Sequence, residues 1–168
     1  MKRVALVLAC VVLVTVIASP ISAQPSYLLH MPLVVNNADS LTPIRAMIAR
    51  MDGNAWLYAA SEPDDGYTYA GMVTSDPTDA NSLINPSGLY GDSASEDSIR
   101  NPASPWGSAD GPYSAMNPEA TDPPLIIWVD WELYGAEELR LTTNAAFAHR
   151  IDPELLLQEL ERRAIQAQ

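Results

Sequence analysis

The chain has 168 residues, with 21 Asp and Glu against 9 Lys and Arg, which gives a net charge of −12. This acidity excludes the basic surface with which proteins bind nucleic acids or anionic membranes. The single cysteine, Cys10, excludes a disulfide scaffold and a metal site built from several thiolates. The length suits one small domain.

Residues 1–23 have the pattern of a secretory signal peptide. Lys2 and Arg3 precede an apolar run over 4–18, and small residues lead to an expected cleavage site after Ala23. The run is shorter than the roughly 20 residues of a spanning helix, which favours cleavage over a retained anchor. A lipoprotein signal ending at Cys10 is the other alternative. Cleavage leaves a secreted, cysteine-free chain without lysine, which excludes a thiol nucleophile and a Schiff-base lysine.

Residues 24–41 form the next predicted unit. Their apolar stretch over 27–35 is interrupted by Pro32 and preceded by Pro25, and proline favours extended backbone. We expect an extended N-terminal segment that lies along the domain, in preference to a sorting signal.

Residues 42–51 have the pattern of a short helix. Thr42 is a good N-cap and Pro43 suits the first helical position. The alternative is a hairpin that turns at Asp52-Gly53, but the helical stripe is better formed than a strand alternation. The stripe consists of Ile44, Met47, Ile48 and Met51.

Two β-hairpins are expected, far apart in the sequence. The first joins 55–60 to 67–74 through a turn-rich stretch over 62–66. The second joins 125–131 to 138–143 through a loop over 132–137. Leu139 and Leu141 alternate with polar residues, so we expect one buried and one wet face there.

Residues 75–124, called here the Asn-Pro segment, lie between the hairpins and hold eight of the 14 prolines. Their composition is typical of a disordered linker. However, the three Asn-Pro pairs follow one another at intervals of 16 residues, and a linker needs no such register. We therefore expect ordered loops in which each unit has a serine, an Asn-Pro pair and an aromatic-glycine pair. The residues of the repeat are Ser82, Asn85, Pro86, Tyr90, Gly91, Ser98, Asn101, Pro102, Trp106, Gly107, Ser114, Asn117 and Pro118.

The last element is a helix that begins after Ile151. Asp152 can cap it, Pro153 suits its first position, and Glu154 favours the positive end of its dipole. Its buried stripe is expected to consist of Leu156, Leu157, Leu160 and Ala164.

The order of these elements resembles a group of small secreted bacterial proteins. In that group a strand leads into repeated Ser-x-x-Asn-Pro-Tyr-Gly units, then a second hairpin and an Ile-Asp-Pro helix. The likeness covers roughly residues 54–160, although Ser87, Ala103 and Glu119 replace the tyrosine after each Asn-Pro pair. The resemblance implies the layout and carries no catalytic residue.

Two groups of acids could carry chemistry. Asp130 and Glu132 lie on one face of a predicted strand beside Trp128 and Trp131, a pattern compatible with cleavage of glycosidic bonds. An acidic, exposed hairpin face is the alternative that we favour. Calcium is the second possibility, because it takes oxygen ligands and extracellular sites can be weak. Its candidate ligands are Asp64, Asp65, Asp76 and Asp79.

Two further motifs give weaker indications of a chemical function. His30 and His149 are too few by themselves to define a zinc site. The sequence over 91–93, Gly-Asp-Ser, matches the nucleophile block of one class of secreted esterases, but no buried strand is expected before it.

The sequence thus predicts a single α+β domain over 42–168, with a small antiparallel sheet made of two hairpins, a covering C-terminal helix and long Pro/Gly-rich repeat loops. The expected function is a non-enzymatic structural or interaction module of the cell envelope or medium, without a cofactor. The alternatives are a secreted hydrolase of polysaccharide or ester and a weak calcium-dependent binding module.

Overall fold

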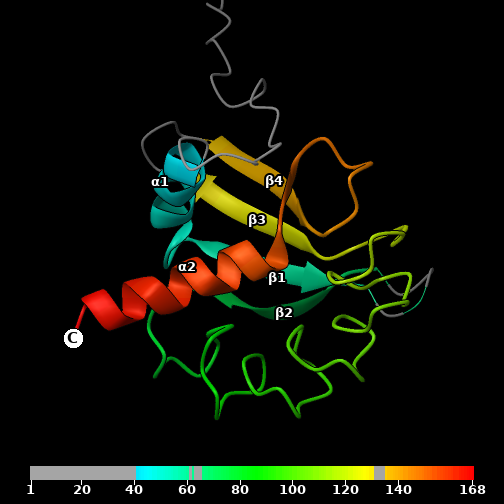
Figure 1. The fold of residues 1–168 in the computed structure, drawn as a ribbon, viewed down its shortest axis with the longest axis horizontal. Coiled ribbons are helices and arrows are strands. Elements are labelled where there is room, and N and C mark those ends of the chain that lie inside the picture. The colour runs from blue at the N-terminus through cyan, green and yellow to red at the C-terminus, as the bar shows by residue number, and fades with distance from the viewer. Residues whose placement is uncertain (1–40, 61, 63–65, 131–134) are drawn as a thin grey trace, which may run out of the picture. The chain divides into compact units, whose positions relative to one another are not determined.

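The computed structural model describes residues 41–60, 62, 66–130 and 135–168 (Figure 1). The predicted signal peptide and residues 24–40 of the predicted N-terminal segment lie outside the described residues. Within the described part of the chain, no helix is long and apolar enough to cross a membrane.

The fold is of the α+β class, as predicted, with a sheet of five strands in the order β2-β1-β3-β4-β5. The sheet is mixed and not purely antiparallel, because β5 runs parallel to β4. Strand β5 was not predicted, because its two residues are too few to show an alternation. The elements in chain order are α1 (Leu41–Met51), β1 (Ala55–Ala59), β2 (Thr68–Val73), β3 (Leu125–Asp130), β4 (Gly135–Leu141), β5 (Arg150–Ile151) and α2 (Pro153–Gln166).

Helix α1 occupies the predicted position and buries Ile44, Ile48 and Met51. It ends at Asp52-Gly53, where Gly53 has a φ of 79°. This left-handed conformation suits glycine and lets the chain turn directly into β1. The alternative hairpin that turns at these residues is therefore wrong.

Both predicted hairpins are present, and they join through their first strands, β1 and β3, which pair antiparallel. The second hairpin departs from its predicted bounds. Strand β4 begins at Gly135, which pairs with Asp130, and not at Glu138. Residues 135–137, expected in the loop, belong to the strand because the backbone pairing of β3 continues to Gly135.

The alternation of buried and wet positions expected in the second strand of this hairpin is not observed. Leu141 is fully buried, but so is Thr142, whose amide donates to the Ile151 carbonyl over 3.0 Å. Leu139 is half-buried like Arg140.

One face of the sheet, called here the inner face, lies in the core. Leu57 of β1 is aligned with Ile126 of β3, and Ala55 is aligned with Trp128. All four are buried. The side chains that alternate with them point to the opposite side of the sheet.

Helix α2 is capped as the sequence predicts, because the Asp152 side chain accepts a hydrogen bond from the Leu155 amide. In Figure 1 it runs in front of β1. Its buried Glu159 pairs with Arg45 of α1 over 3.3 Å. The predicted stripe is buried in full: Leu156, Leu157, Leu160 and Ala164.

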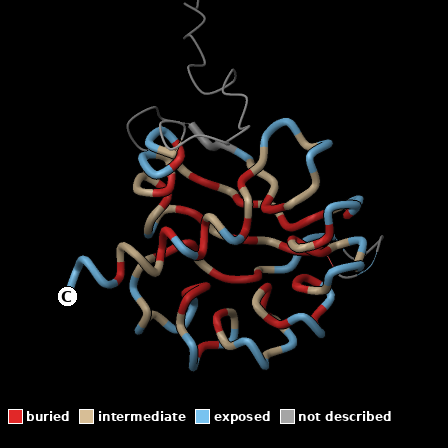
Figure 2. Tube along the Cα trace, in the orientation of Figure 1, coloured by how far each residue is buried: buried red, intermediate tan, exposed pale blue. Residues whose placement is uncertain are grey.

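The Asn-Pro segment leads from the end of β2 to the start of β3 as a series of turns (Figure 1). It begins beside the edge of the sheet, where Met72 of β2 and Ser82 form a parallel bridge. Figure 2 shows buried stretches that recur between exposed ones along the segment. The segment contributes Leu83, Ile99, Trp106 and Ala115 to the core.

Candidate functional site

The three asparagines of the repeat make the same two contacts. The Nδ2 of Asn85, Asn101 and Asn117 donates to the carbonyl oxygen six residues earlier, over 3.0, 2.9 and 2.9 Å. Each Oδ1 accepts a hydrogen bond from the amide two residues later, over 2.9 Å in all three cases. Each carboxamide therefore closes one turn and opens the next. The segment needs these bonds because its backbone groups lack the partners that a helix or a sheet would supply.

The serines three residues earlier follow an equally regular pattern. The hydroxyls of Ser82 and Ser98 donate to the carbonyl oxygen eight residues earlier, over 3.1 and 2.9 Å. The Ser114 hydroxyl lies 3.1 Å from the corresponding oxygen and 2.5 Å from the Ser108 oxygen, between which its single proton is shared. Each hydroxyl also accepts from the amide two residues later. All three serines are fully buried. Because buried polar groups must be hydrogen-bonded, these bonds satisfy the backbone inside the segment.

The aromatic-glycine pairs anchor the units to the sheet. Trp106 is buried and its indole N–H donates to the Ala60 carbonyl over 2.9 Å. Tyr90 packs edge-to-face on Tyr69 of β2, with 5.3 Å between ring centres. A Cβ on Gly107 would lie 2.4 Å from the Asn101 oxygen, which leaves no space for a larger residue.

The same architecture places other side chains of the segment in solvent. The three prolines after the asparagines, at positions 86, 102 and 118, are exposed. Four acids are exposed as well: Asp76, Glu96, Asp110 and Glu119. The backbone bonds thus fix the surface on which these side chains are displayed.

The candidate calcium ligands are engaged in their own loops. Asp76 accepts bonds from the amide and hydroxyl of Thr78, over 2.8 and 2.7 Å. These bonds hold the pKa of Asp76 below its ordinary value. Asp79 accepts the Asn81 amide over 2.8 Å. Asp64 and Asp65 lie outside the described residues, and among those described no three acids, histidines or cysteines are grouped as metal ligands.

Only one member of the candidate catalytic pair lies among the described residues. Asp130 ends β3, where its backbone pairs with Gly135, and Glu132 lies outside the described residues. Residues 91–93 lie in turns and follow no buried strand, and Asp92 accepts the Ala94 amide. His149 is exposed, and its carbonyl accepts the Arg140 amide over 2.9 Å, while His30 lies outside the described residues.

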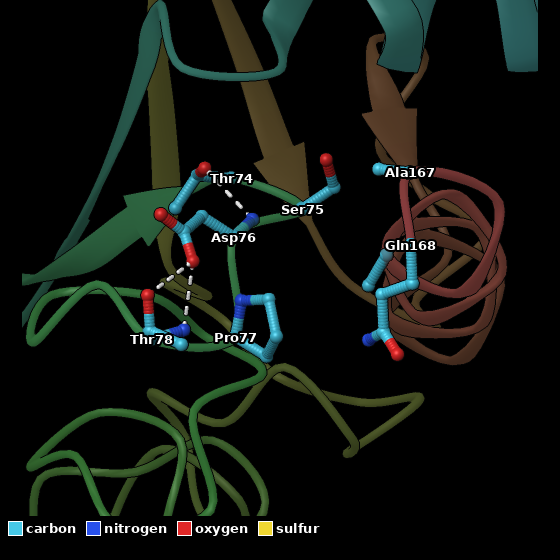
Figure 3. Close-up of a pocket in the computed structure, with 8 residues that line it drawn as sticks. Thr74, Ser75, Asp76, Pro77, Thr78, Ala167 and Gln168 are labelled. Atoms are coloured by element: carbon cyan, nitrogen blue, oxygen red, sulfur yellow. Dashed lines mark hydrogen bonds between the residues drawn. The ribbon is translucent and has the colours of Figure 1, made fainter.

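A cleft of about 370 Å³ lies between the start of the Asn-Pro segment and the end of α2 (Figure 3). Residues 74–78 line one side, and Ala164, Ala167 and Gln168 line the other. The polar groups on the first side bond one another: the Asp76 amide donates to the Thr74 hydroxyl over 3.2 Å. The polar groups on this side of the cleft are therefore already hydrogen-bonded to neighbouring residues.

A cluster that the sequence does not reveal joins three distant segments. The guanidinium of Arg140 on β4 donates to the Tyr67 hydroxyl over 2.7 Å, to Asp122 over 2.8 Å and to the Pro123 carbonyl over 2.8 Å. The Tyr67 hydroxyl also donates to Asp122. Burial, followed by the bond with Asp122, raises the pKa of Tyr67. The cluster ties the end of the Asn-Pro segment to the start of β2.

A second such group is centred on Asp52, just after α1. Its carboxylate accepts bonds from the amide and hydroxyl of Ser75, both over 2.7 Å, and from Arg163 of α2 over 2.8 Å. Burial raises the pKa of Asp52, but these bonds outweigh it and hold the pKa below its ordinary value of 3.8. One side chain thus connects α1, α2 and the Asn-Pro segment.

Sequence patterns located the Asn-Pro repeat but neither charged cluster, because the partners are separated by 17 to 111 residues. A local signal exists only for Asp52, whose Asp-Gly pair marks the end of a helix. Comparison with known proteins adds no further residue, since no family model, curated protein or solved structure matches this chain.

Proposed function

We propose that this protein is an exported, non-enzymatic structural or interaction module of the cell envelope or medium. The observation that carries the proposal is the repeated use of the Asn and Ser side chains of the Asn-Pro segment. These groups bond the backbone at the same offsets in each unit. They therefore serve the architecture of the segment, and the exposed residues between them are available for contact.

A regularly built surface suits an interaction module for a physical reason. Binding by a flexible loop requires its ordering, which reduces affinity. Here the side chain–backbone bonds order the segment before any contact. The predicted signal peptide and the resemblance to secreted bacterial proteins support export.

The proposal is tested by fractionation of the producing cells, followed by co-sedimentation of the purified protein with isolated envelope. We expect the protein in the envelope or the medium. We also expect Asn101→Ala to weaken envelope binding by loosening the segment. The matched control is Asn81→Ala, the same change at an exposed asparagine.

The hydrolase alternative makes a different prediction. If the protein released reducing sugar or cleaved an ester, and Asp130→Ala/Glu132→Ala abolished that activity, the non-enzymatic proposal would be wrong. Retention of the protein in the cytoplasm would also contradict it.

A further inference from the structure

Three tyrosines form a row that leads from the sheet to the Asn-Pro segment. Tyr58 of β1 and Tyr69 of β2 are aligned by the strand register, and their rings meet edge-to-face with 5.9 Å between centres. Tyr90 continues the row from the Asn-Pro segment, with 5.3 Å between its ring centre and that of Tyr69. The shorter of the two contacts therefore joins an edge strand of the sheet to the segment that follows it.

The hydroxyls of Tyr69 and Tyr90 are accessible from solvent. Both residues are half-buried. In the part of the chain that the structure describes, the only buried side-chain oxygen or nitrogen without a hydrogen-bond partner belongs to Thr143. No residue of that part bonds either tyrosine hydroxyl, so both oxygens face solvent. Tyr67 differs, because its hydroxyl is engaged by Arg140.

Each ring of this pair also has a carboxylate near it. Burial, followed by the neighbouring Tyr90 and then Asp79, raises the pKa of Tyr69. Burial, followed by the charge of Asp97, raises the pKa of Tyr90. Both phenols are therefore protonated at neutral pH, and a nearby carboxylate can accept the proton that a phenol loses when it is oxidised.

We propose that Tyr69 and Tyr90 are a site of oxidative cross-linking, at which a dityrosine bond fixes the Asn-Pro segment to β2. The oxidant is hydrogen peroxide, used by a peroxidase. Each phenol gives up one electron and one proton, and the two radicals form a C–C bond between the ring carbons next to their hydroxyls. The hydrogens on these carbons then move to the oxygens, which restores both phenols. The two electrons and two protons reduce one peroxide molecule to two molecules of water.

A covalent link of this kind suits the chain. Cys10 is the only cysteine, so no disulfide can join two parts of one molecule. Met72 and Ser82 already hold the start of the segment against β2, and rotation at χ2 of tyrosine is permissive enough to bring the rings closer. A link between residues 69 and 90 would close a loop in the unfolded chain and so lower its entropy.

Peroxidase and hydrogen peroxide test the proposal in the full chain with Cys10→Ser, in which no thiol consumes the oxidant. Dityrosine is measured by its fluorescence, and a denaturing gel separates monomers from linked copies. We expect a fluorescent monomer whose yield per chain does not depend on protein concentration. Tyr69→Phe and Tyr90→Phe keep both rings but should each lower the yield about tenfold, because the neighbouring phenol is lost. The matched control, Tyr58→Phe, should leave the yield unchanged.

Cleavage of the acid-labile Asp-Pro bonds locates the link. The bond between Asp76 and Pro77 separates Tyr69 from Tyr90, whereas Tyr58 stays on the same fragment as Tyr69. We expect fragments 1–76 and 77–122 to remain joined after oxidation of the parent and to separate after oxidation of Tyr90→Phe. A link between Tyr58 and Tyr69 would leave the two fragments separate.

Thermal unfolding measures whether the link fixes the segment. The oxidised monomer should have a Tm higher by on the order of 5–10 °C than the untreated protein. The same treatment should not raise the Tm of Tyr69→Phe or Tyr90→Phe, because they cannot form this link.

Coupling mainly between copies, separation of the two fragments or an undiminished yield in Tyr90→Phe would overturn the proposed site. A linked monomer with an unchanged Tm would contradict its role in fixing the segment. The proposal is independent of the proposed function, which rests on the backbone bonds of the Asn and Ser side chains.

Discussion

At the scale of single residues, the asparagines of the repeat show how a polar side chain replaces secondary structure. A carboxamide can donate and accept at once, and Asn101 uses both capacities on backbone groups, those of Ser95 and Ala103. The following proline restricts its backbone to extended geometry. The sequence revealed the interval of 16 residues, but not the partner six residues earlier, because that bond depends on the path of the turns.

Asn101→Ala should lower the free energy of unfolding by about 1–3 kcal/mol, because it leaves the Ala103 amide without its acceptor. It also removes one of the two bonds to the Ser95 carbonyl, which keeps the bond from the Ser98 amide. Urea unfolding monitored by tryptophan fluorescence measures the change. Asn81→Ala, at an exposed site, should stay within about 0.5 kcal/mol of the parent. Equal effects of the two substitutions would show that the Asn101 contacts contribute nothing particular.

Asp52 gives stability a defined dependence on pH. Its folded pKa lies below the ordinary value of 3.8, so its ionised form stabilises the fold above that value. This contribution is lost as the pH falls through the folded pKa. Asp52→Asn should therefore cost about 1–3 kcal/mol at pH 7 and reduce the loss of stability on acidification.

Free energies of unfolding between pH 7 and pH 2 test this prediction. Asp110→Asn, at an exposed position, is the control and should retain the acid dependence of the parent. If Asp52→Asn kept that dependence too, other carboxylates would be responsible for it.

At the scale of elements, local signals decided how much could be predicted. Helix α2 was predicted with its cap and its buried stripe, because both are encoded within 14 neighbouring residues. The start of β4 was missed because Gly135 suits a turn as well as a strand end. Strand β5 was missed because its pairing with β4 depends on residues that are ten apart, Arg140 and Arg150.

The cap of α2 offers a test at this scale. Asp152→Ala removes the acceptor for the Leu155 amide and should destabilise the protein by about 1 kcal/mol. Thermal unfolding followed by circular dichroism measures the loss. Asp152→Asn keeps a side-chain acceptor and should retain most of the stability. A loss of equal size in both variants would indicate that charge, and not capping, is the source.

At the scale of the whole molecule, the Asn-Pro segment belongs to the folded unit. The Trp106 indole donates to the Ala60 carbonyl just after β1, and Arg140 of β4 pairs with Asp122 of the segment. Arg100 of the segment pairs with Glu161 of α2 over 2.7 Å. None of these contacts is visible in the sequence, because each joins residues distant along the chain. The 16-residue register predicted order in the segment, whereas its proline-rich composition alone pointed to a linker.

Native-state hydrogen exchange of the segment tests this account most directly. The amides of Gly88, Ser104 and Ala120 donate to the carbonyls of the three asparagines over 3.0, 3.0 and 3.2 Å. If the segment unfolds together with the sheet, these amides should exchange with free energies close to those of β1 and β3. Exchange at the rate of an unstructured peptide while the sheet stays protected would contradict the account.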